Sequence, residues 1–236
     1  MRGISLLLTL LCSLPLAAAE LRLYAWERPP LVQQRAEGGA SGLVVELTAE
    51  LFRRADIPYR LEFLPLQRAL LHVRQEQDSC VLLVERQQER EPYFAWVGPL
   101  LVSRLGLYAK ADDDLQLRSL AQAGGLGILS HQGSGAGEYL QTVGLQVIYS
   151  NKESLNLSML QRSRARLWAT SSAVVASLGV QPAPREVLPF LTLMEDIACN
   201  PGLPPARLQR LRETLLQLYR EGWVQARYRQ HGLDLH

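Results

Sequence analysis

The chain has 236 residues, a formal net charge of +2 and 47% hydrophobic residues. This length allows one large or two small domains with buried cores. The near-neutral charge and the lack of a basic block exclude a typical nucleic-acid-binding protein, so no nucleic-acid partner is expected. Cysteines and histidines do not recur at metal-ligand spacing, and neither a metal nor another cofactor is expected.

The N-terminus has the features of a secretory signal peptide. Arg2 precedes an apolar run over residues 4–16, and three alanines follow at 17–19. This pattern predicts a signal peptide over residues 1–19, so that the exported chain begins at Glu20. A retained membrane anchor is the alternative, although the run is shorter than the roughly 20 apolar residues of a spanning helix.

The first half of the exported chain alternates strands with helices. Val44, Leu47 and Leu51 share one face of a helix, whereas the entirely apolar residues 80–84 are typical of a covered parallel strand. The expected elements are a strand at 21–25, a helix around 44–52, a strand at 59–63, a helix at 66–73 and a strand at 80–84. This order predicts an α/β sheet with helices on both faces.

A second α/β unit follows a long strand at 100–108 and a polar turn at 111–114. Its expected elements are a strand at 126–129, a helix after residue 135, a strand at 146–149, a helix at 155–161, a strand at 167–169 and a helix at 171–178. The alternation of strands and helices again predicts a mostly parallel sheet flanked by helices.

The chain then returns to the first unit. Residues 188–198 form the expected return crossing, and an amphipathic helix begins at Pro205. Because the second unit is inserted in the first, the chain crosses twice between two lobes, as in hinged proteins. We predict lobe 1 over residues 20–105 plus 195–236 and lobe 2 over residues 106–194.

The segment from Glu85 to Pro99 carries a family resemblance. Arg90 follows an apolar strand and stands six residues before Trp96 and nine before Pro99. This arrangement resembles the signature of the family 3 periplasmic solute-binding proteins. Further similar segments are Pro29-Pro30-Leu31, Ser41-Gly42-Leu43, Leu64-Pro65-Leu66-Gln67-Arg68-Ala69, Gln132-Gly133-Ser134-Gly135, Leu167-Trp168-Ala169 and Ile197-Ala198-Cys199-Asn200.

The resemblance implies the type II periplasmic binding fold, a two-lobed arrangement often compared to a Venus flytrap. It implies a monomer in the periplasm that closes on a small polar or amino-acid-like ligand and is not an enzyme. The expected membrane partner is an ABC permease, which would take up the ligand. A membrane sensor that the closed form docks on is the alternative partner.

The resemblance also implies that Arg90 grips a ligand carboxylate, because a guanidinium meets a carboxylate with two parallel hydrogen bonds. The alternative is a surface arginine paired with Glu89 or Glu91. Gly133 and Ser134 precede an expected helix, whose free amide groups favour an anion. The alternative there is an ordinary loop with a capping serine.

Three more candidates lie in or near the expected cleft. The family often has an aromatic residue where Trp26 stands, and Glu27 can meet a ligand ammonium. Arg68 resembles an arginine of a family variant that lines the cleft. The alternatives are core packing for Trp26, a solvated charge for Glu27 and a helix-surface position for Arg68.

The sequence departs from the family pattern at two places. Amino-acid receptors usually carry an aspartate after the Leu-Trp-Ala strand, whereas this chain has Thr170 and Ser171. Their hydroxyls are candidate ligand contacts that can accept a hydrogen bond, but they do not neutralise a buried ammonium. Glu85 ends the strand before Arg90, where hydroxyl residues are common. A carboxylate ligand without a free ammonium, or a ligand whose ammonium meets Glu27 or Glu85, therefore fits better than a standard amino acid.

Cys80 and Cys199 are the two cysteines of the exported chain. An oxidising compartment permits a disulfide between them, and two buried free thiols are the alternative. The resemblance favours the disulfide, because it places both cysteines on neighbouring elements of one lobe.

An enzyme is the remaining alternative, because a few relatives of this fold are periplasmic dehydratases. That chemistry needs a carboxyl group as general acid. Glu27, Glu85, Glu138 and Glu153 are available, but none lies in a pattern that requires catalysis.

Overall fold

The computed structural model describes residues 20–232, so the predicted signal peptide over residues 1–19 lies outside the described residues. Within residues 20–232, no helix has the length and apolar character needed to cross a membrane.

Lobe 1 is built on three parallel strands, all from the first part of the described chain. Its strands are β1 (Leu21–Ala25), β4 (Tyr59–Phe63) and β5 (Ser79–Glu85), and its helices are α1 (Leu43–Ala55), α2 (Leu66–Gln75), η1 (Gln88–Tyr93), α6 (Pro205–Arg220) and α7 (Trp223–Gln230). A two-residue hairpin, β2 (Gln33–Gln34) with β3 (Ala40–Ser41), precedes α1. Every residue of β5 is buried, as expected for a parallel strand with helices on both faces.

Lobe 2 repeats this architecture on a smaller scale. Its strands are β7 (Ile128–His131), β8 (Val147–Ser150) and β9 (Leu167–Ser171), and its helices are η2 (Leu120–Ala123), α3 (Gly135–Thr142), α4 (Glu153–Gln161) and α5 (Ser172–Ser177). Strand β7 pairs in parallel with both β8 and β9. Each lobe has its own hydrophobic cores, so each can retain its packing when the other moves.

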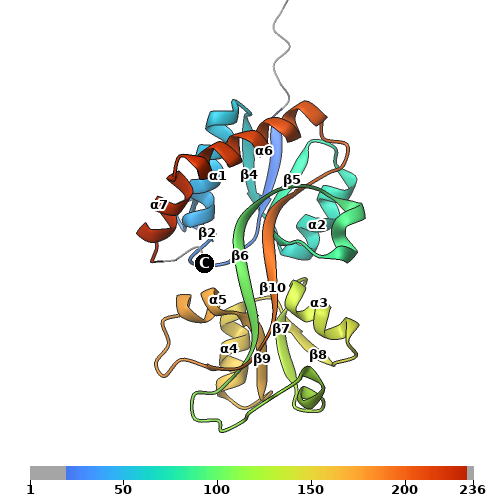
Figure 1. Cartoon of the computed structure of the whole chain (residues 1–236), viewed down its shortest axis with the longest axis vertical. Helices are drawn as coiled ribbons and strands as arrows, with labels where there is room; N and C mark the ends of the chain where they lie inside the picture. Colours follow the sequence, from blue (N-terminus) through green and yellow to red (C-terminus); the bar gives the residue numbers. More distant parts are fainter. Residues whose placement is uncertain (1–19, 233–236) are drawn as a thin grey trace, which may run out of the picture.

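Two long strands connect the lobes (Figure 1). They are β6 (Ala95–Ala109) and β10 (Arg185–Cys199), which pair with each other in antiparallel orientation. They complete one eight-stranded sheet in the order β4-β1-β5-β10-β6-β9-β7-β8. The two-lobed α/β fold with two crossings is thus confirmed. The predicted lobe boundaries at residues 105/106 and 194/195 fall inside the crossing strands, and they stay predictions.

A disulfide joins Cys80 on β5 to Cys199 on β10, and these residues are direct partners in the strand pairing. Their sequence separation is 119 residues, so the loop that it closes contains all of lobe 2. Both residues lie in the lobe 1 core and are fully buried.

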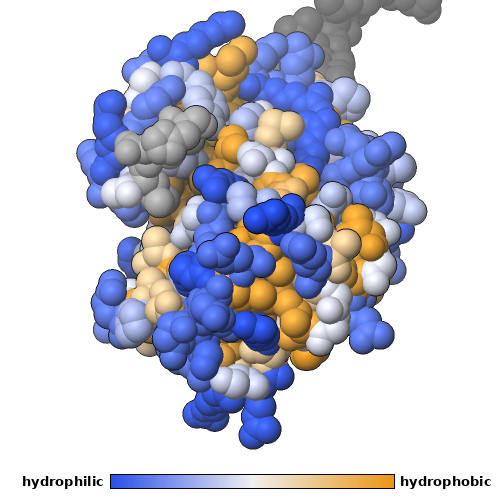
Figure 2. All heavy atoms as spheres, turned by 60° about the horizontal axis from the view of Figure 1, so that its bottom comes forward, coloured by the Kyte–Doolittle hydropathy of each residue, from blue (hydrophilic) through white to orange (hydrophobic). Residues whose placement is uncertain are grey.

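The surface of lobe 2 mixes polar and apolar residues. Figure 2 shows apolar side chains exposed between hydrophilic ones on the end of the molecule that faces the viewer. On β10, apolar residues pack against the lobe 2 core while staying partly accessible; they are Val187, Leu188, Phe190, Leu191 and Leu193.

Candidate ligand-binding site

A pocket of about 530 Å³ has walls from both lobes. Residues of lobe 1 on its wall include Trp26, Glu27, Arg28, Phe63, Leu64 and Gln67; those of lobe 2 include His131, Asn151, Lys152, Glu153, Val174 and Ser177. The volume lies within the range of about 300–1,000 Å³ that is usual for small-molecule sites. The pocket therefore lies where closure of the lobes would enclose a ligand.

Trp26 is held rigidly at the end of β1. Its Nε1 donates a hydrogen bond to the carbonyl of Leu82 at 3.1 Å, and its ring centroid lies 5.0 Å from that of His131 in lobe 2. Glu27 follows it on the pocket wall, is exposed, and accepts a hydrogen bond from the Gln34 amide at 3.1 Å. Trp26 and Glu27 are thus the two predicted site residues that line the pocket.

His131 is a lining residue of lobe 2 that the sequence did not single out. Its side chain is only 6% exposed, and its Nδ1 has no hydrogen-bond partner among the described residues. Burial lowers the pKa of His131 against the opposing effect of Glu153, so the imidazole is neutral at neutral pH. A buried nitrogen without a partner is costly to the fold.

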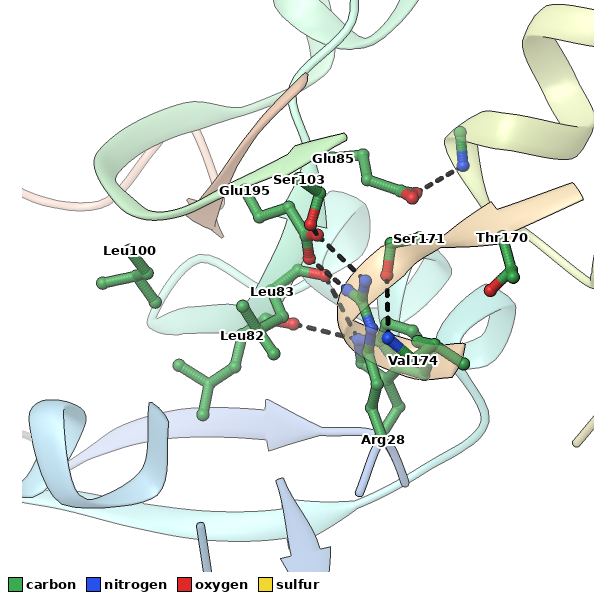
Figure 3. Close-up of polar contacts among 12 residues, drawn as sticks. Arg28, Leu82, Leu83, Glu85, Leu100, Ser103, Thr170, Ser171, Val174 and Glu195 are labelled. Atoms are coloured by element: carbon green, nitrogen blue, oxygen red, sulfur yellow. Dashed lines mark hydrogen bonds and ion pairs between the residues drawn. The ribbon is translucent and has the colours of Figure 1, made fainter. Parts of the chain in front are cut away.

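A buried ion pair lies beside the pocket at the crossing strands (Figure 3). Arg28, which follows β1, donates from both terminal nitrogens to the carboxylate of Glu195 on β10, with Nη2 to Oε1 at 2.9 Å. Ser103 on β6 donates to the same carboxylate. Arg28 and Glu195 are 4% and 0% exposed, so this contact fixes the loop after β1 to both crossing strands.

Arg28 is the most enclosed positive charge on the pocket wall. Burial opposes its charge, but the carboxylates of Glu195, Glu85 and Glu153 together raise the pKa of Arg28 above its ordinary value. Its guanidinium also lies 5.2 Å from the ring centroid of Trp26. Its charge is therefore already balanced by the protein.

Arg90 lies on η1 and is buried, but it does not line the pocket. Its guanidinium donates to the Glu85 carbonyl at 3.2 Å, to the Gly133 carbonyl at 2.8 Å and to Glu138 Oε2 at 2.6 Å. Gly133 and Glu138 belong to lobe 2, so Arg90 bridges the lobes. Neither Glu89 nor Glu91 pairs with it, and Glu91 instead contacts Arg86.

Glu85 makes a second bridge between the lobes. Its Oε2 accepts a hydrogen bond from the Gly135 amide at the start of α3 (Figure 3). Ser134 caps the same helix, because its Oγ accepts from the Gly137 amide at 3.2 Å. Gly133 has a φ of +81°, and a Cβ there would lie 2.9 Å from Gln67 of lobe 1. The loop before α3 therefore touches lobe 1 directly.

The remaining predicted residues lie away from the pocket wall. Thr170 Oγ1 donates to Glu153 Oε1 at 3.4 Å. Ser171 caps α5 by accepting from the Val174 amide (Figure 3). Arg68 is exposed on α2. The structure thus gathers Glu85, Arg90, Gly133 and Ser134 at one interlobe contact. None of the four lines the pocket, but the contact adjoins it, because Leu66 and Gln67 beside Gly133 are lining residues. Their roles toward a ligand stay predictions.

The sequence matches no protein-family model and no curated protein. Solved structures are similar in fold. A mutant of ArgBP from T. maritima has a TM-score of 0.79 at 16% identity, covering 89% of this chain and 94% of that one. The GluR0 ligand-binding core from Nostoc punctiforme in complex with L-glutamate has a TM-score of 0.78 at 19% identity, covering 89% and 98%.

A third similar structure is an ancestral amino acid-binding protein that is a precursor of cyclohexadienyl dehydratase. Its TM-score is 0.78 at 14% identity, covering 89% of this chain and 94% of that one. At these identities the likeness concerns the fold. The chain therefore has the two-lobed type II periplasmic binding fold, as the family 3 resemblance predicted.

Proposed function

We propose that this protein is a periplasmic solute-binding protein that captures a small polar or amino-acid-like molecule between its lobes for uptake by an ABC-type transporter. The observation that carries the proposal is the pocket of about 530 Å³ with walls from both lobes. Similar structures include an ancestral arginine-binding protein bound to arginine and the GluR0 core with L-glutamate, which supports a small-molecule ligand.

Binding and closure are coupled in this proposal. A ligand that contacts Trp26 on one lobe and His131 on the other stabilises only the form in which both walls meet. The crossing strands β6 and β10 are the hinge. A transporter can then distinguish the loaded from the empty receptor by the relative position of the lobes. A membrane sensor in place of the transporter would use the same recognition.

A thermal-shift screen tests the proposal. The exported chain is unfolded and refolded to remove any bound molecule, then screened against amino acids, polyamines and small carboxylates. A ligand at about 100 times its Kd adds about 2.7 kcal/mol and raises the melting temperature visibly.

Two variants of α5 locate the site. Ser177→Trp fills the pocket, because Ser177 lines it, and should abolish the shift. Ser172→Trp adds the same side chain at an exposed position of the same helix that does not line the pocket, and should retain the shift. A shift that persists in Ser177→Trp would place binding elsewhere. A folded protein that no compound stabilises would contradict the proposal.

A further inference from the structure

The donors expected to hold a ligand carboxylate are already occupied by the protein. Arg90 donates to Glu85 O, Gly133 O and Glu138 Oε2, and the Gly135 amide at the start of α3 donates to the Glu85 carboxylate. An amide and a guanidinium that face each other across the lobes are suited to an anion. Here the carboxylate of Glu85 occupies the Gly135 amide and the carboxylate of Glu138 occupies Arg90, so a ligand carboxylate would have to displace them.

The carboxylate that the sequence lacks after β9 is supplied by another element. Glu153, the first residue of α4, accepts from Trp168 Nε1 at 3.1 Å and from Thr170 Oγ1 at 3.4 Å, and both donors lie on β9. Glu153 also lines the pocket. Glu153 thus places a negative charge at the end of β9, on the pocket wall.

The charges of the pocket wall favour a cation. Glu27 and Glu153 line the cavity, whereas the positive charge of Arg28 is neutralised by its ion pair with Glu195. Lys152 is the other basic lining residue, and it is exposed. His131 is neutral and therefore adds no positive charge to the wall. Trp26 and Phe63 add aromatic surface, which attracts cations and apolar groups alike.

From these three observations we propose that the pocket selects a cationic amine that has no carboxylate. Glu153 receives the ammonium of the ligand, and the Glu85 side chain occupies the Gly135 amide that a ligand carboxylate would otherwise bind. This inference rests on the proposed binding function. It predicts that removing an α-carboxylate from an amino acid improves binding.

Matched pairs of ligands test the inference by isothermal titration calorimetry. Each pair is an amino acid and the amine that lacks its carboxylate: arginine with agmatine, lysine with cadaverine, and tyrosine with tyramine. For the wild-type protein, at least one amine should bind about tenfold or more tightly than its parent amino acid. The reason is that the parent carboxylate would compete with the Glu85 carboxylate for the Gly135 amide and with Glu138 for Arg90.

Three variants assign the selectivity to residues. Glu153→Gln keeps the shape and removes the charge, and should weaken amine binding by about 10- to 150-fold, as expected for loss of a charge-assisted hydrogen bond. Glu85→Ala frees the Gly135 amide and should reduce the preference for the amine by raising amino-acid affinity. Glu213→Gln, on an exposed position of α6, should change neither affinity.

The outcomes separate the two proposals. An amino acid that binds the wild type as tightly as its amine, with binding lost in Arg90→Ala, would overturn this inference and leave the binding function standing. The absence of binding by both members of every pair and by every compound of the wider screen would overturn both. The comparison within the wild type does not depend on how well any variant folds.

Discussion

The buried pair of Arg28 and Glu195 makes a strong prediction about stability. Both side chains are almost inaccessible, and Glu195 accepts from both terminal nitrogens of Arg28 and from Ser103. Arg28→Met leaves the carboxylate buried with one hydroxyl donor and should lower the free energy of unfolding by about 3–5 kcal/mol. Glu195→Leu leaves the guanidinium of Arg28 buried without its carboxylate and should lower the free energy of unfolding by a similar amount.

A double variant measures the interaction energy between Arg28 and Glu195 separately from the cost of losing each side chain. Arg28→Met with Glu195→Leu removes both charges and fills the space with apolar groups, so its cost should be well below the sum of the single costs. Urea unfolding followed by far-UV circular dichroism measures each free energy.

An exposed ion pair between the two crossing strands provides the control. Arg104 on β6 and Glu186 on β10 are 2.9 Å apart, but the arginine is 58% exposed. Arg104→Met should therefore cost less than about 1 kcal/mol. A cost for Arg28→Met as small as that for Arg104→Met, or a double variant equal to the sum of its singles, would refute the assignment of a buried, coupled pair.

Three further predictions concern the disulfide, Asp196 and the interlobe contact at Gly133. Replacing Cys80 and Cys199 by serine should lower the free energy of unfolding by up to about 5 kcal/mol, because the 119-residue separation gives a long loop; a loss under about 1 kcal/mol in urea would contradict this. Burial raises the pKa of Asp196 to about 6 from its ordinary 3.8, so its ionisation destabilises the fold as the pH rises through this range. Asp196→Asn should therefore stabilise the protein at pH 8 by up to about 3 kcal/mol but not near pH 3, and an equal effect at both pH values in urea unfolding would be the wrong result. Gly133→Ala should cost about 1–3 kcal/mol, because φ is +81° and the Cβ would press on Gln67; an unchanged melting temperature would argue against this contact.

Much of the fold could be predicted because local patterns determine it. The apolar run that became β5 and the helical spacing in α1 report burial directly. The insertion of one α/β unit in another followed from the order of the elements. The predicted starts of the crossing strands were less accurate, since β6 begins at Ala95 and β10 at Arg185, several residues before the predicted strands.

The site was harder to predict because its contacts are long-range. Trp26 was identified through the family resemblance, together with its neighbour Glu27, yet the adjacent Arg28 was missed because its partner is 167 residues away. Arg90 was expected to hold a ligand, but its protein acceptor Glu138 lies 48 residues along the chain. Sequence patterns describe which side chains carry charge, whereas the fold decides which charges are already paired.

Glu153 is a case in which the fold supplies a charge that the local sequence did not indicate. The Thr170-Ser171 segment lacks an acid, and the sequence therefore indicated no counter-charge at the end of that strand. Glu153 reaches that position from α4, because β9 lies close enough for Thr170 and Trp168 to donate to it.

In the proposed function both lobes hold one small molecule, and a titration with one variant from each lobe tests this most directly. Gln67 and Asn151 line the pocket from lobes 1 and 2 and are both exposed, so alanine at either position should leave the fold intact. The first compound that stabilises the wild type is titrated into Gln67→Ala and Asn151→Ala by calorimetry. We expect weaker binding in both variants. Unchanged affinity in either one would contradict a ligand enclosed between the lobes.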